Sequence, residues 1–550
     1  MVDSTSTSDR YRVVSQSTKS RAQFCFELAD ITTFVVNEIN DSAKPTKSAR
    51  KELVAFACIC RSTVYPVMRV LWREQTGLDN LLRTLPSDAW KKEWVGKIGQ
   101  VFAEHNGNED DIDEELMAQA GAHLLKNQRG VISLKRPLLS FEWQRFDYYA
   151  AFIRCLVISS RPIEWSPEAL LALQLHRSFR GSPLLPNLKE FTWKGKPDTI
   201  LSTTLFLPPT LKRISVRAGN DISWTQAFLS DFPKVSPEVE DIYINGFLRA
   251  KPLDIRPLLG CIHLRSLSIP EIGSTVESAL KLAQLPRLER LSLFFVQPPA
   301  SENPSPHRSS PCVFHRVTSL ECNSAPEFLQ ASRFPVLQSI SITEQFSVGI
   351  RGTLDALWKN CSPDILSEIS IMCLRRGGLV SSLTLEDIQP AYNFRRLEIF
   401  TVMTAQWIWN DQELERMAST WSRLRRLSIY STIPRMYEPR GFTLLGLVHL
   451  AKCCPRLSCL CIRLRKQDPP ISLPDIPEDW SSNFRLQTIS FSGAEIEESQ
   501  YDTVAAFLSS LFPNLRRIKT LFTSDRFDCW ERIEGLLHAF GAARAYTQRE

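Results

Sequence analysis

This chain of 550 residues lacks the features typical of a membrane protein or of a disulfide-stabilised domain. Its longest apolar runs, such as Leu53 to Cys60, fall far short of the about 20 residues that a membrane-spanning helix needs. The 14 cysteines show no disulfide-framework spacing, which is typical of a reducing compartment. The segment Met1–Gln23 is polar and rich in serine and threonine, unlike a secretory signal. We therefore expect an intracellular protein, in the cytoplasm, the nucleus or both, with no membrane partner.

Catalytic and cofactor motifs are also missing. The sequence contains no phosphate loop, dinucleotide fingerprint, metalloprotease helix or serine elbow. The eight histidines are isolated, and none lies beside a cysteine pair at zinc-finger spacing. The best metal candidate is the thiol group Cys453, Cys454, Cys459 and Cys461, but its spacing fits tetrahedral zinc poorly, so buried free cysteines are the favoured interpretation. We predict no catalytic residues, no metal site, no cofactor and no enzymatic activity.

Basic residues are not concentrated anywhere along the chain. The 66 basic and 60 acidic residues leave a net charge of +6, without a basic tract. Nucleic-acid-binding domains usually carry a pronounced basic stripe or cluster. The sequence therefore predicts no nucleic-acid partner.

One short motif recurs from about Arg154 to the end of the chain. Each copy has an apolar residue, two variable residues, a second apolar residue, a mostly small polar residue and a third apolar residue, as in residues 188–193, Leu-Lys-Glu-Phe-Thr-Trp. Steps of 20 to 33 residues separate the copies, and repeats of this length are typical of solenoids. The first apolar positions are Leu188, Leu211, Val239, Leu264, Leu288, Val317, Leu337, Leu366, Leu397, Leu424, Leu457, Leu486 and Leu515. Residues 153–158 are a degenerate first copy. We predict an α/β solenoid of strand–helix units over residues 151–550, with a parallel sheet on its concave face and a last helix near 529–540 that covers its end.

The two variable positions beside the middle apolar residue point away from the core, because side chains alternate along a strand. The second of them is Ser or Thr in nine of thirteen copies. One interpretation is structural: a small hydroxyl fits a crowded inner face. The other is functional: a row of such positions with isolated charges forms a protein-binding surface. The sequence leaves both interpretations open. The candidate contacts for an unknown target protein are Glu190, Arg213, Asp241, Tyr243, Arg290, Glu321, Glu368, Arg426 and Arg517.

The part before the repeats divides by composition. Residues 1–22 are expected to be a disordered tail, 23–86 a helical module, and 87–150 a linker and bridge with an acidic loop at 104–115. Within the module we expect a helix from near Ser48 and a separate helix over Val67–Arg73. The first of these is expected to face inward with Leu53, Val54, Phe56, Ala57 and Cys60. Residues 297–311, rich in proline and serine, are expected to be a flexible insertion in the repeats.

The repeats resemble leucine-rich repeats, and residues 53–61 followed by 67–74 resemble the second half of an F-box. The whole plan is similar to the large F-box/leucine-rich-repeat families of basidiomycete fungi. The resemblance implies a non-catalytic substrate receptor: the F-box-like module binds the adaptor subunit of a cullin–RING ubiquitin ligase, and the repeats bind the target. It makes a set of residues candidates for the module's core or its adaptor face, namely Leu28, Ile31, Val35, Ile39, Phe56, Cys60 and Leu71.

The sequence departs from the F-box pattern at two places. Residues 27–30, Glu-Leu-Ala-Asp, stand where the family has a leucine-proline pair, and residues 62–64, Ser-Thr-Val, stand where it has an aromatic residue. The alternative interpretation is therefore an interaction scaffold that has lost adaptor binding.

Overall fold

The computed structural model describes most of the chain, in two units. The described ranges are 29–41, 47–95, 129–158, 163–194, 203–218, 222–246, 252–296, 311–323, 325–344, 350–373, 382–404, 406–407, 409–431, 441–465, 482–492, 496–520 and 528–547. The first unit comprises Met1–Gly195 with Leu205–Leu211, and the second Lys196–Thr204 with Lys212–Glu550. The predicted tail at 1–22, residue Leu28, the acidic loop at 104–115 and residues 297–310 of the insertion lie outside the described ranges.

Three mutually packed helices form the start of the first unit. They are α2 (Ala29–Asp41), α3 (Lys47–Ala57) and α4 (Arg61–Leu71). Their buried centre consists of Val36, Leu53, Phe56 and Val67, with Val35, Ile39, Ala57, Val70 and Leu71 packed against it. The strand β1 (Glu74–Gln75) and the short helix α5 (Asp79–Leu82) follow.

A small sheet and two further helices complete the first unit. Its elements are β2 (Trp90–Val95), β3 (Arg129–Leu134), η2 (Ser140–Glu142), α9 (Trp143–Ala150), β4 (Cys155–Ile158), β5 (Ile163–Trp165), α10 (Pro167–Arg180) and β6 (Glu190–Trp193). Strands β2, β3 and β5 form a three-stranded sheet, while β1, β4 and β6 pair in parallel. Helix α9 connects the module to the repeats through two aromatic contacts: Tyr149 stacks on Trp72 with ring centroids 4.4 Å apart, and Trp143 stacks on His176 of α10 at 4.1 Å.

The second unit alternates strands with helices. Its twelve sheet strands are β7 (Arg213–Arg217), β8 (Asp241–Asn245), β9 (Ser266–Ser274), β10 (Arg290–Phe295), β12 (Ser319–Asn323), β14 (Ser339–Glu344), β15 (Glu368–Cys373), β17 (Ile399–Thr404), β19 (Arg426–Ser431), β20 (Cys459–Arg463), β21 (Thr488–Ser492) and β22 (Arg517–Thr520). Short strands β11 (Cys312–Val313) and β13 (Ser332–Arg333) form one pair, and β16 (Ser382–Leu383) and β18 (Gln406–Trp407) form another. The helices are α11 (Ile222–Val235), η4 (Arg256–Gly260), α12 (Val276–Lys281), η5 (Leu282–Gln284), α13 (Pro326–Gln330), α14 (Ile350–Asn360), α15 (Leu385–Ile388), η7 (Gln389–Asn393), α16 (Asp411–Thr420), α17 (Leu447–Cys453), η8 (Glu498–Gln500), α18 (Tyr501–Leu511) and α19 (Asp528–Thr547).

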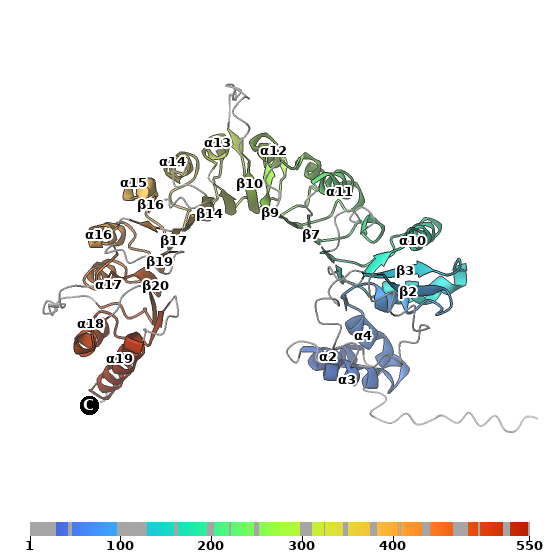
Figure 1. Ribbon diagram of the computed structural model, residues 1–550, viewed down its shortest axis with the longest axis horizontal. Coiled ribbons are helices and arrows are strands. Elements are labelled where there is room, and N and C mark those ends of the chain that lie inside the picture. Colours follow the sequence, from blue (N-terminus) through green and yellow to red (C-terminus); the bar gives the residue numbers. More distant parts are fainter. Residues whose placement is uncertain are drawn as a thin grey trace, which may run out of the picture. The chain divides into compact units, whose positions relative to one another are not determined.

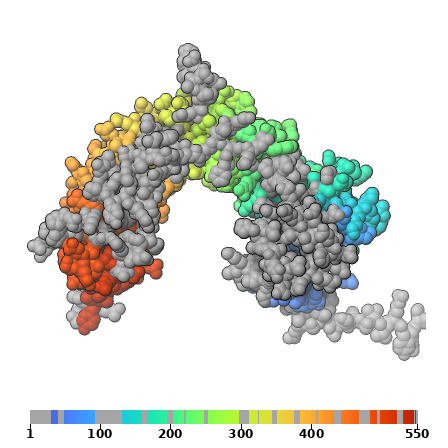
Figure 2. Space-filling model, in the orientation of Figure 1, coloured from blue at the N-terminus to red at the C-terminus, as the bar shows by residue number. Residues whose placement is uncertain are grey.

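Within the second unit, the strands line the inner side of a curve and the helices its outer side (Figure 1). Successive repeats follow one another along this curve in chain order, from green to red in Figure 2. The reason lies in the repeated motif: all thirteen first apolar positions are buried, eleven of them in the second unit. The second and third motif positions of the sheet strands from β7 to β21 are buried too, whereas in β22 Ile518 is buried and the third position is the half-buried Thr520. Each repeat packs on its neighbours, so the core is continuous along the unit.

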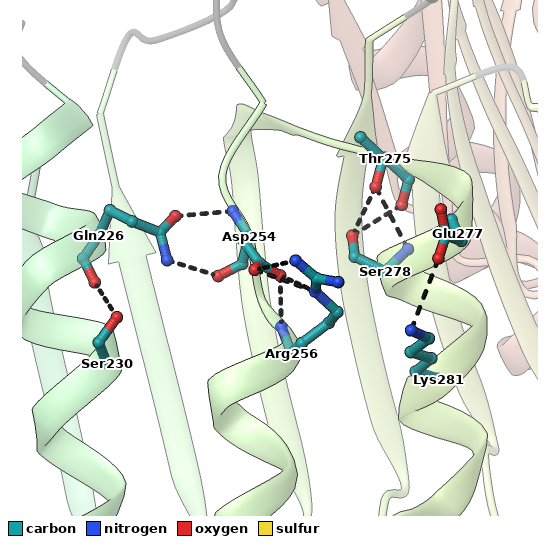
Figure 3. Close-up of polar contacts among 8 residues, drawn as sticks. All are labelled: Gln226, Ser230, Asp254, Arg256, Thr275, Glu277, Ser278 and Lys281. Carbon is teal, nitrogen blue, oxygen red and sulfur yellow. Dashed lines mark hydrogen bonds and ion pairs between the residues drawn. The ribbon is translucent and has the colours of Figure 1, made fainter.

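Polar side chains join neighbouring repeats on the helical side. Gln226 of α11 donates through Nε2 to the carbonyl of Asp254, 3.0 Å away, and accepts from the Asp254 amide at 2.8 Å (Figure 3). Thr275 caps the start of α12 by accepting from the amide of Ser278. The Gln226 bonds thus connect two repeats, while the Thr275 cap, within one repeat, satisfies an amide that the start of α12 leaves unpaired.

The predicted fold class, an α/β leucine-rich-repeat solenoid preceded by a helical module, is confirmed. The prediction for Val54 is wrong, because α3 turns this side chain toward solvent while it buries Leu53 and Phe56. The prediction that a helix starts at Val67 is also wrong: α4 begins at Arg61 and contains Pro66. The prolyl ring removes one backbone donor, and tertiary packing of Thr63 and Val67 keeps the helix continuous.

Candidate binding surfaces

The residues predicted for the module's core or adaptor face occupy different environments. Phe56 is buried in the module's centre, and Val35, Ile39 and Leu71 are half-buried against it. Ile31 is exposed, and Cys60 lies at the start of α4, where its thiol is 2.9 Å from the Ser62 hydroxyl. Most of this set therefore serves the core, and a partner could reach Phe56 only if the module opened.

Sequence reasoning named the exposed Ile31 but missed three more strongly exposed apolar residues of the module. Phe34 of α2 is 65% exposed, Val54 of α3 is 51% exposed, and Ile59 in the turn after α3 is 56% exposed. Their positions could have been found from the helical period, because Phe34 lies two residues before the buried Val36 and Val54 directly follows the buried Leu53. Large apolar side chains that remain in water on so small a module are candidates for burial by a partner.

The solvent-facing positions of the second unit's strands form straight rows. The second variable position of every strand from β7 to β22 pairs in register with the next. The row consists of Ser215, Tyr243, Ser268, Ser292, Glu321, Ser341, Ser370, Thr401, Ser428, Cys461, Ser490 and Lys519. Ser292, Ser428 and Cys461 lie on this face but are buried by their neighbours. A second row, one alternation earlier, holds Arg213, Asp241, Arg290, Glu368, Arg426 and Arg517. The candidate residue Glu190 occupies the same motif position on β6 in the first unit.

Charges on the first strands of the second unit neutralise one another. Arg290 forms an ion pair with Asp241, and Ser292 donates a hydrogen bond to Glu321, with the oxygens 2.9 Å apart. Along the edge where the strands begin, Lys212 forms an ion pair with Glu240. The hydrogen bond from Lys212 is the main cause that lowers the pKa of the Glu240 carboxyl. In this region of the strand surface, acidic and basic side chains are therefore interspersed and largely paired with one another.

The thiols singled out as a metal candidate are packed as ordinary core or surface groups. Cys454 is buried and donates weakly to the carbonyls of Ala418 and Trp421, each 3.7 Å away, and burial raises the pKa of Cys454 and of Cys461 to about 12. Within the described ranges, no three side chains of His, Cys, Asp or Glu gather where they could hold a metal ion. In the same part of the chain, no helix has the length and apolarity to cross a membrane.

Comparisons with known proteins add little to this geometry. No family model matches the sequence, and no curated protein matches it. Among solved structures, the leucine-rich-repeat ectodomain of the plant membrane receptor kinase GASSHO1/SCHENGEN3 from Arabidopsis thaliana, in complex with CASPARIAN STRIP INTEGRITY FACTOR 2, is 11% identical with a TM-score of 0.27. The match covers 68% of this chain and 48% of that ectodomain, so the chain spans about half of its length. The class of protein is thus defined by the fold itself: a leucine-rich-repeat solenoid with an N-terminal helical module.

Proposed function

We propose that this protein is a non-catalytic substrate receptor of a cullin–RING ubiquitin ligase. The N-terminal module binds the ligase adaptor subunit, and the solvent-facing strand surface of the repeats binds the target protein. Such a receptor accelerates modification by raising the local concentration of its target beside the ligase.

The observation that carries this proposal is the exposed apolar set on the module, Phe34, Val54 and Ile59. The module has a core of its own, and these three side chains do not belong to it. Burying apolar surface is worth about 25 cal/mol per Å² removed from water, and three such side chains supply a useful part of an interface.

The test is co-purification of the full chain with the adaptor subunit. A triple variant, Phe34→Ser with Val54→Ser and Ile59→Ser, is expected to keep its fold and to lose capture, because exposed substitutions change stability by only about 0.5 kcal/mol each. The matched control removes three exposed apolar residues from α10, which are Leu171, Leu175 and Phe179. The control is expected to retain capture. Loss of capture in the control alone would remove the module from the proposal.

A second candidate function, a repeat scaffold without adaptor binding, has a specific observation in its favour. Where the F-box family has an aromatic residue, Thr63 is buried and its hydroxyl donates to the Cys60 carbonyl at 2.7 Å, which completes the start of α4 without a partner. The module can then act only as a helical cap for the first repeat. Absence of capture by the folded wild-type chain would favour this function over the first.

A further inference from the structure

Four consecutive strand segments near the C-terminus carry cations and no acid. These segments are β19 to β22 with the turns that lead into them, residues 423–431, 454–465, 482–492 and 513–520. They contain ten cations, Arg423, Arg425, Arg426, Arg456, Arg463, Arg465, Arg485, Arg516, Arg517 and Lys519. Every corresponding segment from β8 to β17 contains at least one Glu or Asp. The overall charge of +6 hides this asymmetry, because the ten residues are spread over a long stretch of sequence that only the fold brings together.

Three of these cations lie on the two rows defined above and are exposed, and we call Arg426, Arg517 and Lys519 the basic strand surface. Arg463, two residues beyond Cys461 on the same face of β20, is half-buried and is not included. Arg426 and Arg517 belong to one row, connected in register through Cys459 and Thr488. Lys519 ends the next row, two residues further along β22. Since neighbouring strands are about 4.8 Å apart, the three steps from β19 to β22 separate the two arginine Cα atoms by roughly 14 Å.

The basic strand surface is exposed to solvent. One carboxylate of the described residues lies beside it, that of Glu534 on α19, which accepts from the amide of Ile518 at 2.7 Å. All three side chains are exposed, and within the described part of the chain none of them forms an ion pair or hydrogen bond. Arg290 and Arg425, by contrast, are paired with Asp241 and Glu398. Between the cations the floor consists of short side chains, including Cys459, Thr488 and Ser490, all of them half-buried. The long cationic side chains therefore stand on either side of short side chains, some of which carry hydroxyl groups.

We propose that the basic strand surface binds an acidic segment of a partner protein, rich in Asp and Glu. The proposal rests on the protein-binding role proposed above for the strand surface. It specifies where on that surface the partner binds, at β19–β22, and that the bound segment is negatively charged. Guanidinium and ammonium groups recognise carboxylates through charge-assisted hydrogen bonds. The hydroxyls of Thr488 and Ser490 can bond to a peptide backbone that crosses between the cations.

A nucleic acid suits this surface less well. Proteins that bind single strands combine cations with aromatic platforms on which bases stack. On the described solvent-facing positions of β19–β22, Tyr430 is the one aromatic residue, and the positions between the cations are Ser, Thr and Cys. The small floor accommodates a peptide strand and offers no stacking surface.

The experiment measures binding of a fluorescein-labelled ten-residue peptide of alternating Glu and Asp to the full chain, by fluorescence anisotropy. We expect the acidic peptide to bind and an otherwise identical Gln/Asn peptide not to bind. Affinity should fall as salt rises, because exposed charges are screened. The triple charge reversal Arg426→Glu, Arg517→Glu and Lys519→Glu is expected to weaken binding at least tenfold.

The matched control reverses three exposed cations on the helices, Lys234→Glu, Lys359→Glu and Lys452→Glu, which changes the net charge equally. It should alter affinity by less than twofold. Equal weakening in both triple variants, or no binding by the wild-type chain, would overturn the proposal. Tighter binding of a labelled ten-nucleotide single strand that displaces the peptide would also overturn it, in favour of a nucleic-acid partner.

The chain's own acidic run is a competing occupant that the same assay can identify. Residues 104–115 carry seven acids, and a variant without them should bind the peptide with unchanged affinity. A gain of tenfold or more would make that run the occupant and overturn the assignment to a partner protein. Adaptor capture, measured on the same samples, keeps the two proposals separate: the strand-surface variant should still capture the adaptor.

Discussion

Arg290 on β10 reaches across Ser266 on β9 to form an ion pair with Asp241 on β8. Its Nη2 lies 3.0 Å from Asp241 Oδ1, and its Nε donates to the Ser266 hydroxyl at 3.3 Å. Two residues that the repeat pattern predicts as separate target contacts thus neutralise each other across three strands. A partner that used either one would first have to break this pair, so the early strands are a weaker recognition site than the unpaired cations of β19–β22.

The Asp241–Arg290 pair should contribute little to stability. Both side chains are more than a third exposed, and exposed pairs are worth about 0.2–1 kcal/mol. A double-mutant cycle of Asp241→Ala and Arg290→Ala in urea denaturation should give a coupling free energy in that range. A coupling above about 2 kcal/mol would show that the pair is a structural element of the sheet.

Asn483 should contribute far more to stability than the Asp241–Arg290 pair, because its side chain forms hydrogen bonds with backbone groups at a buried turn. Its Nδ2 donates to the Cys454 carbonyl at 2.8 Å, and its Oδ1 accepts from the amides of Arg485 and Leu486. Asn483→Ala leaves these buried groups without partners and should lower the free energy of unfolding by on the order of 3 kcal/mol.

The matched control for Asn483 is Asn514, in the next repeat. Its Nδ2 donates to the Phe484 carbonyl at 2.7 Å, but the side chain is exposed, so water can replace the bond. Asn514→Ala should cost less than about 1 kcal/mol in the same urea titration. Similar losses in the two variants would contradict the importance assigned to burial.

Two glycines should respond to alanine in opposite directions. Gly441 has a φ of +150°, and a Cβ there would lie 2.9 Å from the Arg465 amide nitrogen, so Gly441→Ala should lower the thermal unfolding midpoint. Gly535 lies in α19 with open space around it, and Gly535→Ala should raise stability by about 0.5–1 kcal/mol because alanine favours the helix. Calorimetry of the two variants checks both signs. A stabilising Gly441→Ala would mean that the backbone there can relax.

The repeat register can be read from the sequence because every copy has to bury the same three apolar positions. That constraint alone assigns Ser215, Tyr243 and Lys519 to one row, and the strand pairing agrees with it. The same register places Arg426 and Arg517 at one motif position, but the sequence does not show which cations form ion pairs. The structure does: Arg290 pairs with Asp241, which lies two strands away.

The helical module is harder to predict, for a different reason. Its helices are short, and one residue decides which side chain faces inward: α3 buries Leu53 and exposes its neighbour Val54. Pro66 also suggests a helix boundary, because proline usually interrupts a helix. In the structure α4 continues past Pro66, and Thr63 and Val67 on either side of it are buried. Tertiary contacts, rather than local preference, settle both points.

The cysteines should divide sharply in reactivity. Cys60 is partly accessible, and the hydrogen bond with Ser62 lowers the pKa of its thiol, whereas burial raises the pKa of Cys454 and Cys461 to about 12. Iodoacetamide at about pH 7.5, followed by peptide mass spectrometry, should alkylate Cys60 in the native protein and leave the other two unmodified until urea is added. Early modification of Cys454 would indicate that the last repeats open locally.

Acid should weaken the connection that Arg136 makes in the first unit. Its guanidinium bonds to Asp88 at 2.8 Å and to Glu142 at 2.7 Å, and these hydrogen bonds hold the pKa of both carboxyls below their ordinary values. A carboxyl whose pKa is lower in the folded state than in the unfolded state stabilises the fold above its unfolded pKa, roughly pH 4, and loses this effect as pH falls through its folded pKa.

Arg136→Met should therefore lower the thermal unfolding midpoint of the full chain at about pH 7, and the difference from the wild type should shrink as the pH falls toward about 3. Lys135→Met is the matched control, because it removes the same charge from the neighbouring, exposed position. Its midpoint should stay close to that of the wild type at each pH. A difference for Arg136→Met that grows on acidification would mean that the arginine acts mainly by packing its stem, and not through the two carboxylates.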